Sequence, residues 1–262
     1  CRRAANGAEF MQRIQRETGL KLDIIKPEEE AQLAVISCAP LVNRKTHNLL
    51  VVDIGGGSTE LVWIDISKVP KADRAQSIMR LHGGFHQAKT DVPAARVVDW
   101  ISVPLGVATL RDQFSDVEDD AARFALMSWF FEENLTDFTP YQSIQSQDHF
   151  QIVGTSGTVT TVAASHLGLK RYDRTKVDGL RMTSAQIDKV IHSYLAMGPG
   201  GRRADPRIGL DRQALIMSGA AILQALMRCW PTDRLSVADR GLREGLLYAQ
   251  MSADGVLEEG LG

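Results

Sequence analysis

Residues 49–64 read LLVVDIGGGSTELVWI, and this stretch decides the fold. An apolar run ends in an aspartate, three glycines and a serine follow, and a glutamate then opens a second apolar run. Both runs are typical of largely buried strands, so the stretch predicts a strand, a tight loop and a second strand. Glycine leaves the main-chain N–H groups open to an anion, so Gly55, Gly56 and Gly57 predict a phosphate-binding loop.

Polar side chains flank this loop on both sides. Asp53, at the strand end, is suited to hold a hydrated Mg²⁺, which takes only one or two carboxylates beside the phosphates of a substrate. Ser58 and Thr59 each offer a hydroxyl donor, and we expect Ser58 to bind phosphate together with the glycines. An ordinary glycine-rich hairpin turn is the alternative interpretation. Acids on both sides of the loop, Asp53 and Glu60, favour the phosphate loop over that alternative.

The common nucleotide-binding loops do not fit this stretch. A dinucleotide fingerprint has Gly-x-Gly-x-x-Gly opening a helix, whereas residues 61–64 are prone to form a strand. The sequence also lacks the Gly-Lys-Ser/Thr of a P-loop at this position. The stretch therefore indicates a phosphate loop inside a hairpin.

The composition is that of an ordinary globular protein. Of the 262 residues, 44% are hydrophobic and 24% are charged, which suits one large or two smaller domains. A net charge of −2 predicts no nucleic-acid or membrane partner, and no apolar run approaches the ~20 residues of a membrane span. Cys1, Cys38 and Cys229 are odd in number and far apart, so we expect no disulfide framework and a cytoplasmic location.

Periodicity and capping signals predict the other elements. Helices are expected over residues 3–18, 119–138, 159–167, 184–197 and 211–229 and from 242 onward. Strands are expected over residues 21–25, 97–103, 150–153 and 235–238. Strands interleaved with helices indicate an α/β protein with a mixed sheet.

Arginines cluster between residues 202 and 212, at Arg202, Arg203, Arg207 and Arg212. They could draw a polyanionic substrate toward a cleft. The acids among them make a salt-bridged surface at least as good an interpretation.

Several segments together resemble the exopolyphosphatase and guanosine pentaphosphate phosphatase family, within the actin-like ATPase and sugar-kinase superfamily. These segments are RRAAN at 2–6, PEEEAQL at 27–33, DIGGGSTE at 53–60, VPLG at 103–106, GTSGT at 154–158 and DRGLREG at 239–245. The resemblance covers nearly the whole chain and implies an actin-like fold, a mixed sheet flanked by helices.

The resemblance also implies a domain organisation. Residues 1–30 would be the C-terminal part of an otherwise missing first actin-like domain, residues 31–240 the second domain, and residues 241–262 a C-terminal helix returning toward the first. The chain resembles the short form of the family, without the C-terminal helical domain of longer members.

Site roles follow from the same resemblance. Arg2 would be a phosphate-binding arginine, Glu30 the general base, and Glu60 a second acid that holds water or metal. The GTSGT turn before a helix would be a second phosphate loop, with Gly157 and Thr158 as its binding residues. Without the resemblance, that turn is equally well an ordinary capped helix start.

The implied activity is Mg²⁺-dependent hydrolysis, or hydrolysis with another divalent cation, of the terminal phosphate of inorganic polyphosphate or guanosine pentaphosphate. Phosphoryl transfer depends mainly on positioning and charge neutralisation, which suits a site of acids and glycines. Two alternatives stay open: a kinase or ATPase of the same fold, and a non-catalytic sensor of polyphosphate or an alarmone. A homodimer sharing the cleft is a further open alternative.

Overall fold

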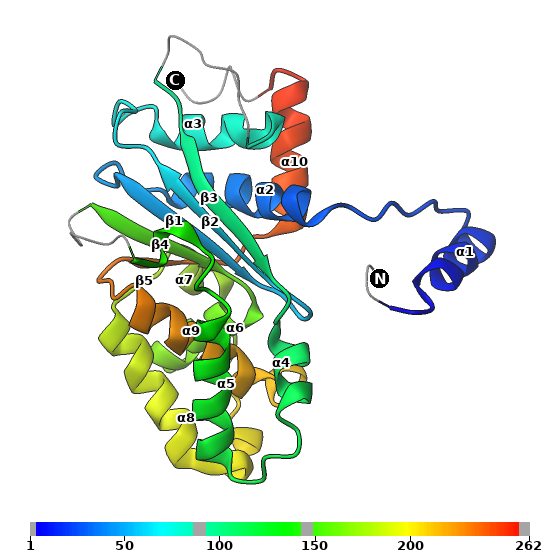
Figure 1. The fold of residues 1–262 in the computed structure, drawn as a ribbon, viewed down its shortest axis with the longest axis vertical. Helices are drawn as coiled ribbons and strands as arrows, with labels where there is room; N and C mark the ends of the chain where they lie inside the picture. The colour runs from blue at the N-terminus through cyan, green and yellow to red at the C-terminus, as the bar shows by residue number, and fades with distance from the viewer. Residues whose placement is uncertain (1–3, 86–92, 143–148, 257–262) are drawn as a thin grey trace.

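A six-stranded mixed sheet forms the centre of the computed structural model, which describes residues 4–85, 93–142 and 149–256 (Figure 1). The strands lie in the order β3-β2-β1-β4-β6-β5. Their bounds are β1 Asn48–Ile54, β2 Thr59–Asp65, β3 Arg96–Val103, β4 Phe150–Thr155, β5 Arg181–Met182 and β6 Leu235–Ala238. Strands β1, β4 and β6 run parallel, whereas β2, β3 and β5 run antiparallel to the strands they pair with. The predicted mixed sheet is confirmed.

Helices cover both faces of this sheet (Figure 1). One face carries α2 (Pro27–Cys38), α3 (Arg74–Met79) and α10 (Leu242–Ala253). The other face carries α4 (Val107–Gln113), α5 (Asp120–Glu133), α6 (Gly157–His166), α8 (Ser184–Ala204) and α9 (Ile216–Cys229). A short helix, α7 (Arg174–Val177), precedes β5.

Strand β1 is buried on both faces, which explains its uninterrupted apolar run. Leu50 and Val52 belong to the core beneath α5, α6, α8 and α9, and Leu49 and Val51 to the core beneath α2 and α10. Side chains alternate along a strand, so Asp53 lies on the α2 face with Leu49 and Val51. This parity places the first predicted metal ligand at the end of the face that α2 covers.

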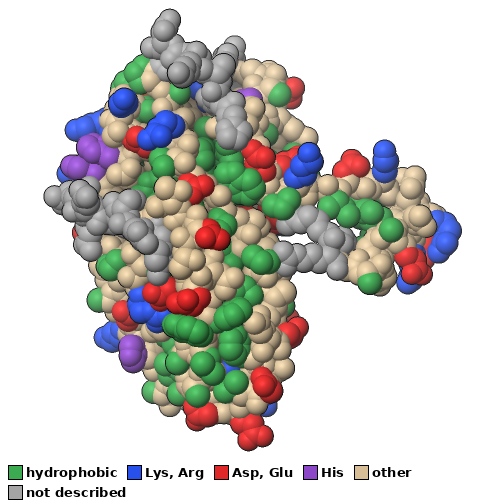
Figure 2. Space-filling view, in the orientation of Figure 1, with side chains coloured by type: hydrophobic (Ala, Val, Ile, Leu, Met, Phe, Trp, Pro, Cys, Tyr) green, Lys and Arg blue, Asp and Glu red, His purple; other side chains and the backbone are tan. Residues whose placement is uncertain are grey.

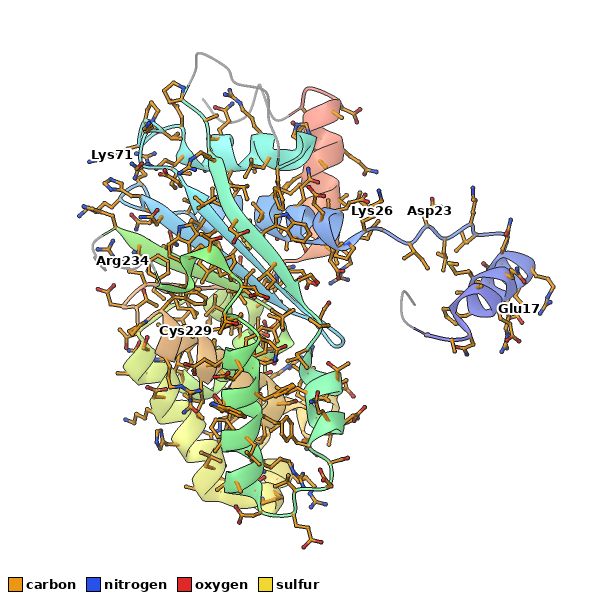
Figure 3. All side chains as sticks on the ribbon, in the orientation of Figure 1. Glu17, Asp23, Lys26, Lys71, Cys229 and Arg234 are labelled. Atoms are coloured by element: carbon orange, nitrogen blue, oxygen red, sulfur yellow. The ribbon has the colours of Figure 1, made fainter. Side chains whose placement is uncertain are left out.

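The N-terminal helix α1 (Gly7–Thr18) and the residues after it extend away from the sheet (Figure 1). Gly19, with φ of 76°, ends α1 in the left-handed conformation. The strand expected over residues 21–25 is wrong, because residues 19–26 have no regular structure as far as Lys26, labelled in Figure 3 where α2 begins. None of the described strands pairs with this segment, and Leu20 is 62% exposed. Alternating apolar residues form a strand only where a neighbouring strand accepts their backbone hydrogen bonds.

Other helix boundaries differ by a few residues from the expected ones. Helix α1 begins at Gly7 rather than residue 3, and α5 ends at Glu133 rather than residue 138. Helix α8 is interrupted at Gly198 (φ 64°, ψ 178°), just before Pro199, and then continues to Ala204. Helix α9 begins after a short 3₁₀ turn instead of at residue 211.

The surface carries a mixture of charges. Acidic and basic side chains are interspersed over the face shown in Figure 2, in agreement with the small net charge. Within the described ranges, no helix combines the length and the apolar character needed to cross a bilayer.

Candidate active site

The loop joining β1 and β2 is held by the N-terminus of α4. Gly55 N–H donates to the Ser58 carbonyl at 2.9 Å and closes the turn. The carbonyls of Gly55 and Gly56 in turn accept from the N–H groups of Val107 at 3.0 Å and Ala108 at 2.9 Å. The loop therefore has a defined backbone path fixed by hydrogen bonds from the first turn of a helix.

Gly106 makes this close approach feasible. A Cβ atom at residue 106 would lie 2.5 Å from both the Gly55 carbonyl oxygen and the Gly56 carbonyl carbon. Those are backbone atoms, which cannot move aside as a side chain can. Gly55 is restricted in the same way, since its Cβ would lie 2.9 Å from the Ser58 carbonyl oxygen.

The loop presents free hydrogen-bond donors on its outer side. Among the described residues, the N–H groups of Gly56, Gly57 and Ser58 donate to no protein acceptor. Gly56 and Gly57 are exposed, and nothing lies within 4 Å of where their Cβ atoms would be. Adjacent free N–H groups form a concave donor surface that suits a phosphate.

Asp53 and Glu60, the acids on either side of the loop, are direct partners in the β1–β2 ladder. Directly paired residues of an antiparallel ladder project from the same face, so the two carboxylates are neighbours. Glu60 is only 2% exposed, and its Oε1 accepts a hydrogen bond from Ser102 Oγ at 2.9 Å. Ser102 comes from β3, the next strand of the sheet, and was not predicted as a site residue.

The third predicted acid, Glu30, reaches the same place from the first turn of α2. The pKa of Asp53 is raised to about 7, first by burial of the carboxyl and then by the negative charges of Glu60 and Glu30. The three acids predicted from the sequence are therefore brought together at one end of β1. Pro27 at the helix start and Lys26 in extended conformation before it direct this first turn.

Two of these three acids, Asp53 and Glu60, suit a divalent cation. No group of three or more His, Cys, Asp or Glu side chains is arranged as a complete metal cage in the described part of the chain. Mg²⁺ needs no such cage, because it binds through one or two carboxylates, waters and substrate phosphates. The Asp53 carboxyl is partly buried and receives no hydrogen bond from any described residue, so its charge has no partner among them. Asp53 and Glu60 are thus the residues present that suit the cation.

The GTSGT turn joins β4 to α6. Ser156 Oγ accepts from the N–H groups of Thr158 and Val159, each at 3.1 Å, and caps the helix. Thr158 is 6% exposed and packs against α9, where a Cβ on Gly219 would lie 2.0 Å from Thr158 Oγ1. Gly157 lines a cavity and Thr158 does not. The predicted phosphate contact at Thr158 stays a prediction, and its visible role is helix packing.

A cavity of about 420 Å³ opens at the carboxyl ends of the parallel strands β1, β4 and β6. It is lined by Asp53, Thr155, Ser156, Gly157, Arg174, Ala238, Asp239, Arg240, Gly241, Leu242, Arg243 and Glu244. The N-termini of α6 and α10 both border it, and each provides the positive end of a helix dipole. Asp53 belongs both to the lining of this cavity and to the acid cluster.

Arginines at the cavity were not assigned from the sequence. Arg174 donates to the Asp239 carbonyl at 2.6 Å and lies 3.4 Å from Glu244 Oε1. Arg240 and Arg243 belong to the DRGLREG segment that carried the family resemblance, and Arg243 had no assigned role. The DRGLREG segment runs directly into the start of α10, and arginines beside a helix N-terminus are the sequence signal that could have pointed to these residues.

Three of the four arginines between 202 and 212 make contacts that bear on their role. Arg202 bonds both carboxylate oxygens of Asp120, at 2.6 and 2.8 Å, and Arg207 is paired with Asp205. Arg207 thus forms a salt bridge with an acid of its own segment, as expected, whereas Arg202 is buried and pairs with an acid of α5. Arg212 instead lies over Gly157, where a Cβ would come within 2.0 Å of its guanidinium, and both residues line a second cavity of about 320 Å³.

Arg2 lies outside the described residues. The predicted phosphate contact of Arg2 and the division into residues 1–30, 31–240 and 241–262 both stay predictions. Helix α10 packs against α2 within the described structure, where a Cβ on Gly245 would lie 2.1 Å from the Leu33 carbonyl oxygen.

The chain is similar to curated phosphatases. It is 23% identical to exopolyphosphatase 1 of Mycobacterium leprae over 97% of this chain and 66% of the relative. It is 26% identical to guanosine-5'-triphosphate,3'-diphosphate pyrophosphatase of Aeromonas salmonicida over 94% of this chain and 42% of the relative. The chain therefore spans less than two thirds of the length of these relatives.

The fold is similar to that of solved structures. The crystal structure of the Aquifex aeolicus member of the Ppx/GppA family aligns with a TM-score of 0.70 and 28% identity, over 97% of this chain and 72% of that one. The predicted actin-like α/β fold is thereby confirmed. The profile of the Ppx/GppA phosphatase family matches residues 1–254, almost the whole chain. Because this match extends over almost all of the sequence, the chain belongs to the Ppx/GppA phosphatase family.

Proposed function

We propose that the complete protein is a Mg²⁺-dependent phosphohydrolase that removes the terminal phosphate of inorganic polyphosphate or guanosine pentaphosphate. The observation that carries the proposal is the convergence of Asp53, Glu60 and Glu30 beside a loop with free N–H groups. The names of the relatives, an exopolyphosphatase and a guanosine pentaphosphate pyrophosphatase, support a phosphoanhydride as substrate.

Phosphate binding is assigned to backbone donors. The N–H groups of Gly56, Gly57 and Ser58 would donate to the terminal phosphate, and Gly55 would keep the turn closed. Gly157, at the N-terminus of α6, lines the same cavity as Asp53 and would contact the phosphate that follows the terminal one. Arg2 would add a bidentate guanidinium contact.

Glu30 is assigned the role of general base. Its carboxylate would accept a proton from a water molecule while the water oxygen attacks the terminal phosphorus atom. The bond from that phosphorus atom to the bridging oxygen breaks, and the shortened anhydride leaves.

Asp53 and Glu60 would hold the divalent cation, and Ser102 would orient Glu60 by its hydrogen bond. Bound Mg²⁺ supplies neutralisation of the phosphate charges and of the charge that develops on the leaving oxygen.

The test is phosphate release by the complete protein from long-chain polyphosphate, guanosine pentaphosphate and ATP, with Mg²⁺ and with EDTA. Glu30→Gln should reduce kcat at least ~100-fold, because it removes the group that takes the proton. Glu29→Gln is the matched control, since Glu29 is in the same helical turn but is exposed and lines a different cavity, with His82 and Leu246.

Three results would contradict the proposal. Release of phosphate that is indifferent to Glu30→Gln would remove the catalytic assignment. Transfer of phosphate from ATP to an acceptor, without hydrolysis of polyphosphate or pentaphosphate, would favour a kinase. Tight binding of these anhydrides without turnover would favour a sensor.

A further inference from the structure

The turn formed by residues 239–241 carries Arg240 to the cavity and leads into α10. The carboxylate of Asp178, in the loop between α7 and β5, bonds both Arg240 and the backbone of this turn. Asp178 Oδ2 accepts from Arg240 Nη2 at 2.8 Å and from Nε at 3.1 Å. Asp178 Oδ1 accepts from the Asp239 N–H at 3.0 Å. The Arg240 guanidinium therefore donates two charged hydrogen bonds to the Asp178 carboxylate, a forked contact, and the backbone of the same turn donates a third.

Asp178 is ionised in this setting. Burial raises the pKa of its carboxyl, but hydrogen bonds from Arg240 and the Asp239 N–H, with the charges of Arg240 and Arg174, outweigh burial and lower it overall. The Arg240 pKa is raised, mainly by the hydrogen bond to Asp178. The pair is thus charged on both sides at neutral pH, and it is partly shielded from water, with side chains 22% and 17% exposed.

Further contacts show that the turn is a fixed unit. Thr155 Oγ1, at the end of β4, donates to the Arg240 carbonyl. Glu244 Oε2 accepts from the Gly241 N–H at 2.9 Å and caps α10. Tyr248 contacts Arg240 Nη1 through its hydroxyl at 3.2 Å. Asp178 bonds both the Arg240 side chain and the backbone of the turn. It is not among the residues that line the cavity.

We propose that Asp178 is a positioning residue for phosphate binding, which fixes the turn at 239–241 and thereby holds Arg240 and the first turn of α10 at the cavity. The inference rests on the proposed function, because that function supplies the phosphate-bearing ligand. Asp178 acts through Arg240 and the turn and contacts no ligand itself. The assignment adds a residue from the loop before β5 to a site built mainly from β1, β4 and α10.

Asp178→Asn tests the role at nearly constant volume. It keeps a side-chain acceptor but loses the charge, so Arg240 is released from its fork and the turn gains freedom. We expect KM for the preferred anhydride to rise about tenfold over wild type, while kcat stays within about twofold. A change of this kind means that the variant has lost binding energy equally in the ground state and in the transition state. Asp178→Glu retains the charge and should recover part of the loss.

Asp173→Asn is the matched control. Asp173 lies five positions earlier, pairs with Lys176 and bonds Thr175, but makes none of the contacts given above with the turn. Its removal should leave KM unchanged. A merely structural role for Asp178 would instead lower the active fraction, seen as reduced kcat and a lower melting temperature at constant KM.

Direct binding of pyrophosphate, measured by calorimetry in the presence of Ca²⁺, separates this inference from the proposed function. A wild-type protein that binds pyrophosphate but hydrolyses no anhydride would contradict the proposed function. In that case, about tenfold weaker pyrophosphate binding by Asp178→Asn would still support the positioning role of Asp178. Binding and KM unchanged in Asp178→Asn would overturn it, as would a wild-type protein that binds no pyrophosphate. If Asp178→Asn does not fold, Arg240→Lys, which keeps the charge and loses the fork, must show the same weakened binding.

Discussion

Asp53 and Glu60 face each other across the first antiparallel ladder of the sheet, one register position inside the loop that joins their strands. Burial is the main cause of the raised pKa of Asp53, and the repulsion between two acids so placed adds to it. Proteins retain such an arrangement mainly where a cation or a proton completes it. The pair is the centre from which the predictions about metal, pH and loop geometry follow.

Asp53→Asn should stabilise the metal-free protein at alkaline pH. The Asp53 pKa is raised from 3.8 to about 7 in the folded state, so folding favours its protonated form. The protonated Asp53 carboxyl therefore stabilises the folded state. This stabilisation is complete below the pKa that Asp53 has in the unfolded chain, and it is lost as the pH rises through the pKa that Asp53 has in the folded protein. The ionised acid then costs up to about 4 kcal/mol above pH 7. In EDTA we expect the free energy of unfolding of Asp53→Asn to exceed that of wild type by about 1–4 kcal/mol at pH 8 and by under ~1 kcal/mol at pH 4.

Asp65→Asn provides a control of opposite sign at the far end of β2. Burial raises the pKa of Asp65, but hydrogen bonds from Ser67 and Arg96 outweigh burial and lower it overall. Its stabilisation is present above the unfolded pKa and is lost as pH falls, so Asp65→Asn should be destabilising at pH 8. Urea titrations at both pH values measure both variants. A lower stability of Asp53→Asn in EDTA at pH 8 would contradict the prediction.

Gly106→Ala should disturb the phosphate loop. The new methyl group would overlap the backbone of Gly55 and Gly56, so α4 and the loop must separate, at a cost of about 1–3 kcal/mol in folding stability. We also expect a large loss of phosphate release, because the free N–H groups would be displaced. Gly56→Ala, whose Cβ meets nothing within 4 Å, should keep wild-type stability. Equal melting temperatures for wild type and Gly106→Ala would show that the contact is not restrictive.

Ser102→Ala should weaken the cation site without affecting the fold. Without the hydroxyl donor, the buried Glu60 carboxylate loses a charged hydrogen bond of about 1.5–3 kcal/mol and the contact that orients it. The Mg²⁺ concentration for half-maximal activity should rise about tenfold at pH 7. The Mg²⁺ titration is repeated with Ser115→Ala, an exposed hydroxyl that donates to the Asp112 carbonyl and should leave the titration unchanged. An unaltered titration for Ser102→Ala would remove Glu60 from the cation site.

Gly245→Ala should loosen α10 from α2. Its Cβ would lie 2.1 Å from the Leu33 carbonyl oxygen, so the helices must move apart, and we expect a loss of about 1–3 kcal/mol in stability. Gly200→Ala, in α8 with open space around its Cβ, should be neutral or slightly stabilising because alanine favours helix. Thermal melting compares the two, and a larger loss in Gly200→Ala would contradict this account.

The local parts of the site could be predicted from the sequence because short motifs encode them. The hairpin, the glycine loop and both neighbouring acids lie within residues 49–64, and β1 and β2 formed in the expected place. The proximity of Glu30 depended on the family resemblance, since nothing in its local sequence tells which strand end α2 will meet.

Features created by tertiary contacts were not predictable in the same way. The strand expected at 21–25 needed a pairing partner that the described structure does not provide. The roles of Ser102 and Asp178 depend on partners that are distant in the sequence. Ser102 bonds Glu60 on the neighbouring strand, and Asp178 bonds the backbone of Asp239, 61 positions away. A single sequence shows what a residue is able to bond and leaves open what it meets.

The hydrogen bonds from α4 to the glycine loop have a thermodynamic consequence for ligand capture. Glycine loses more conformational entropy than other residues when it is ordered, and a flexible run of three would oppose binding if the ligand had to order it. Here Val107 and Ala108 already hold the loop carbonyls, so that entropy is lost when the chain folds. On the proposed function, the phosphate would therefore meet a loop that is already ordered, and α4 would contribute to the affinity without being among the groups assigned to contact the phosphate.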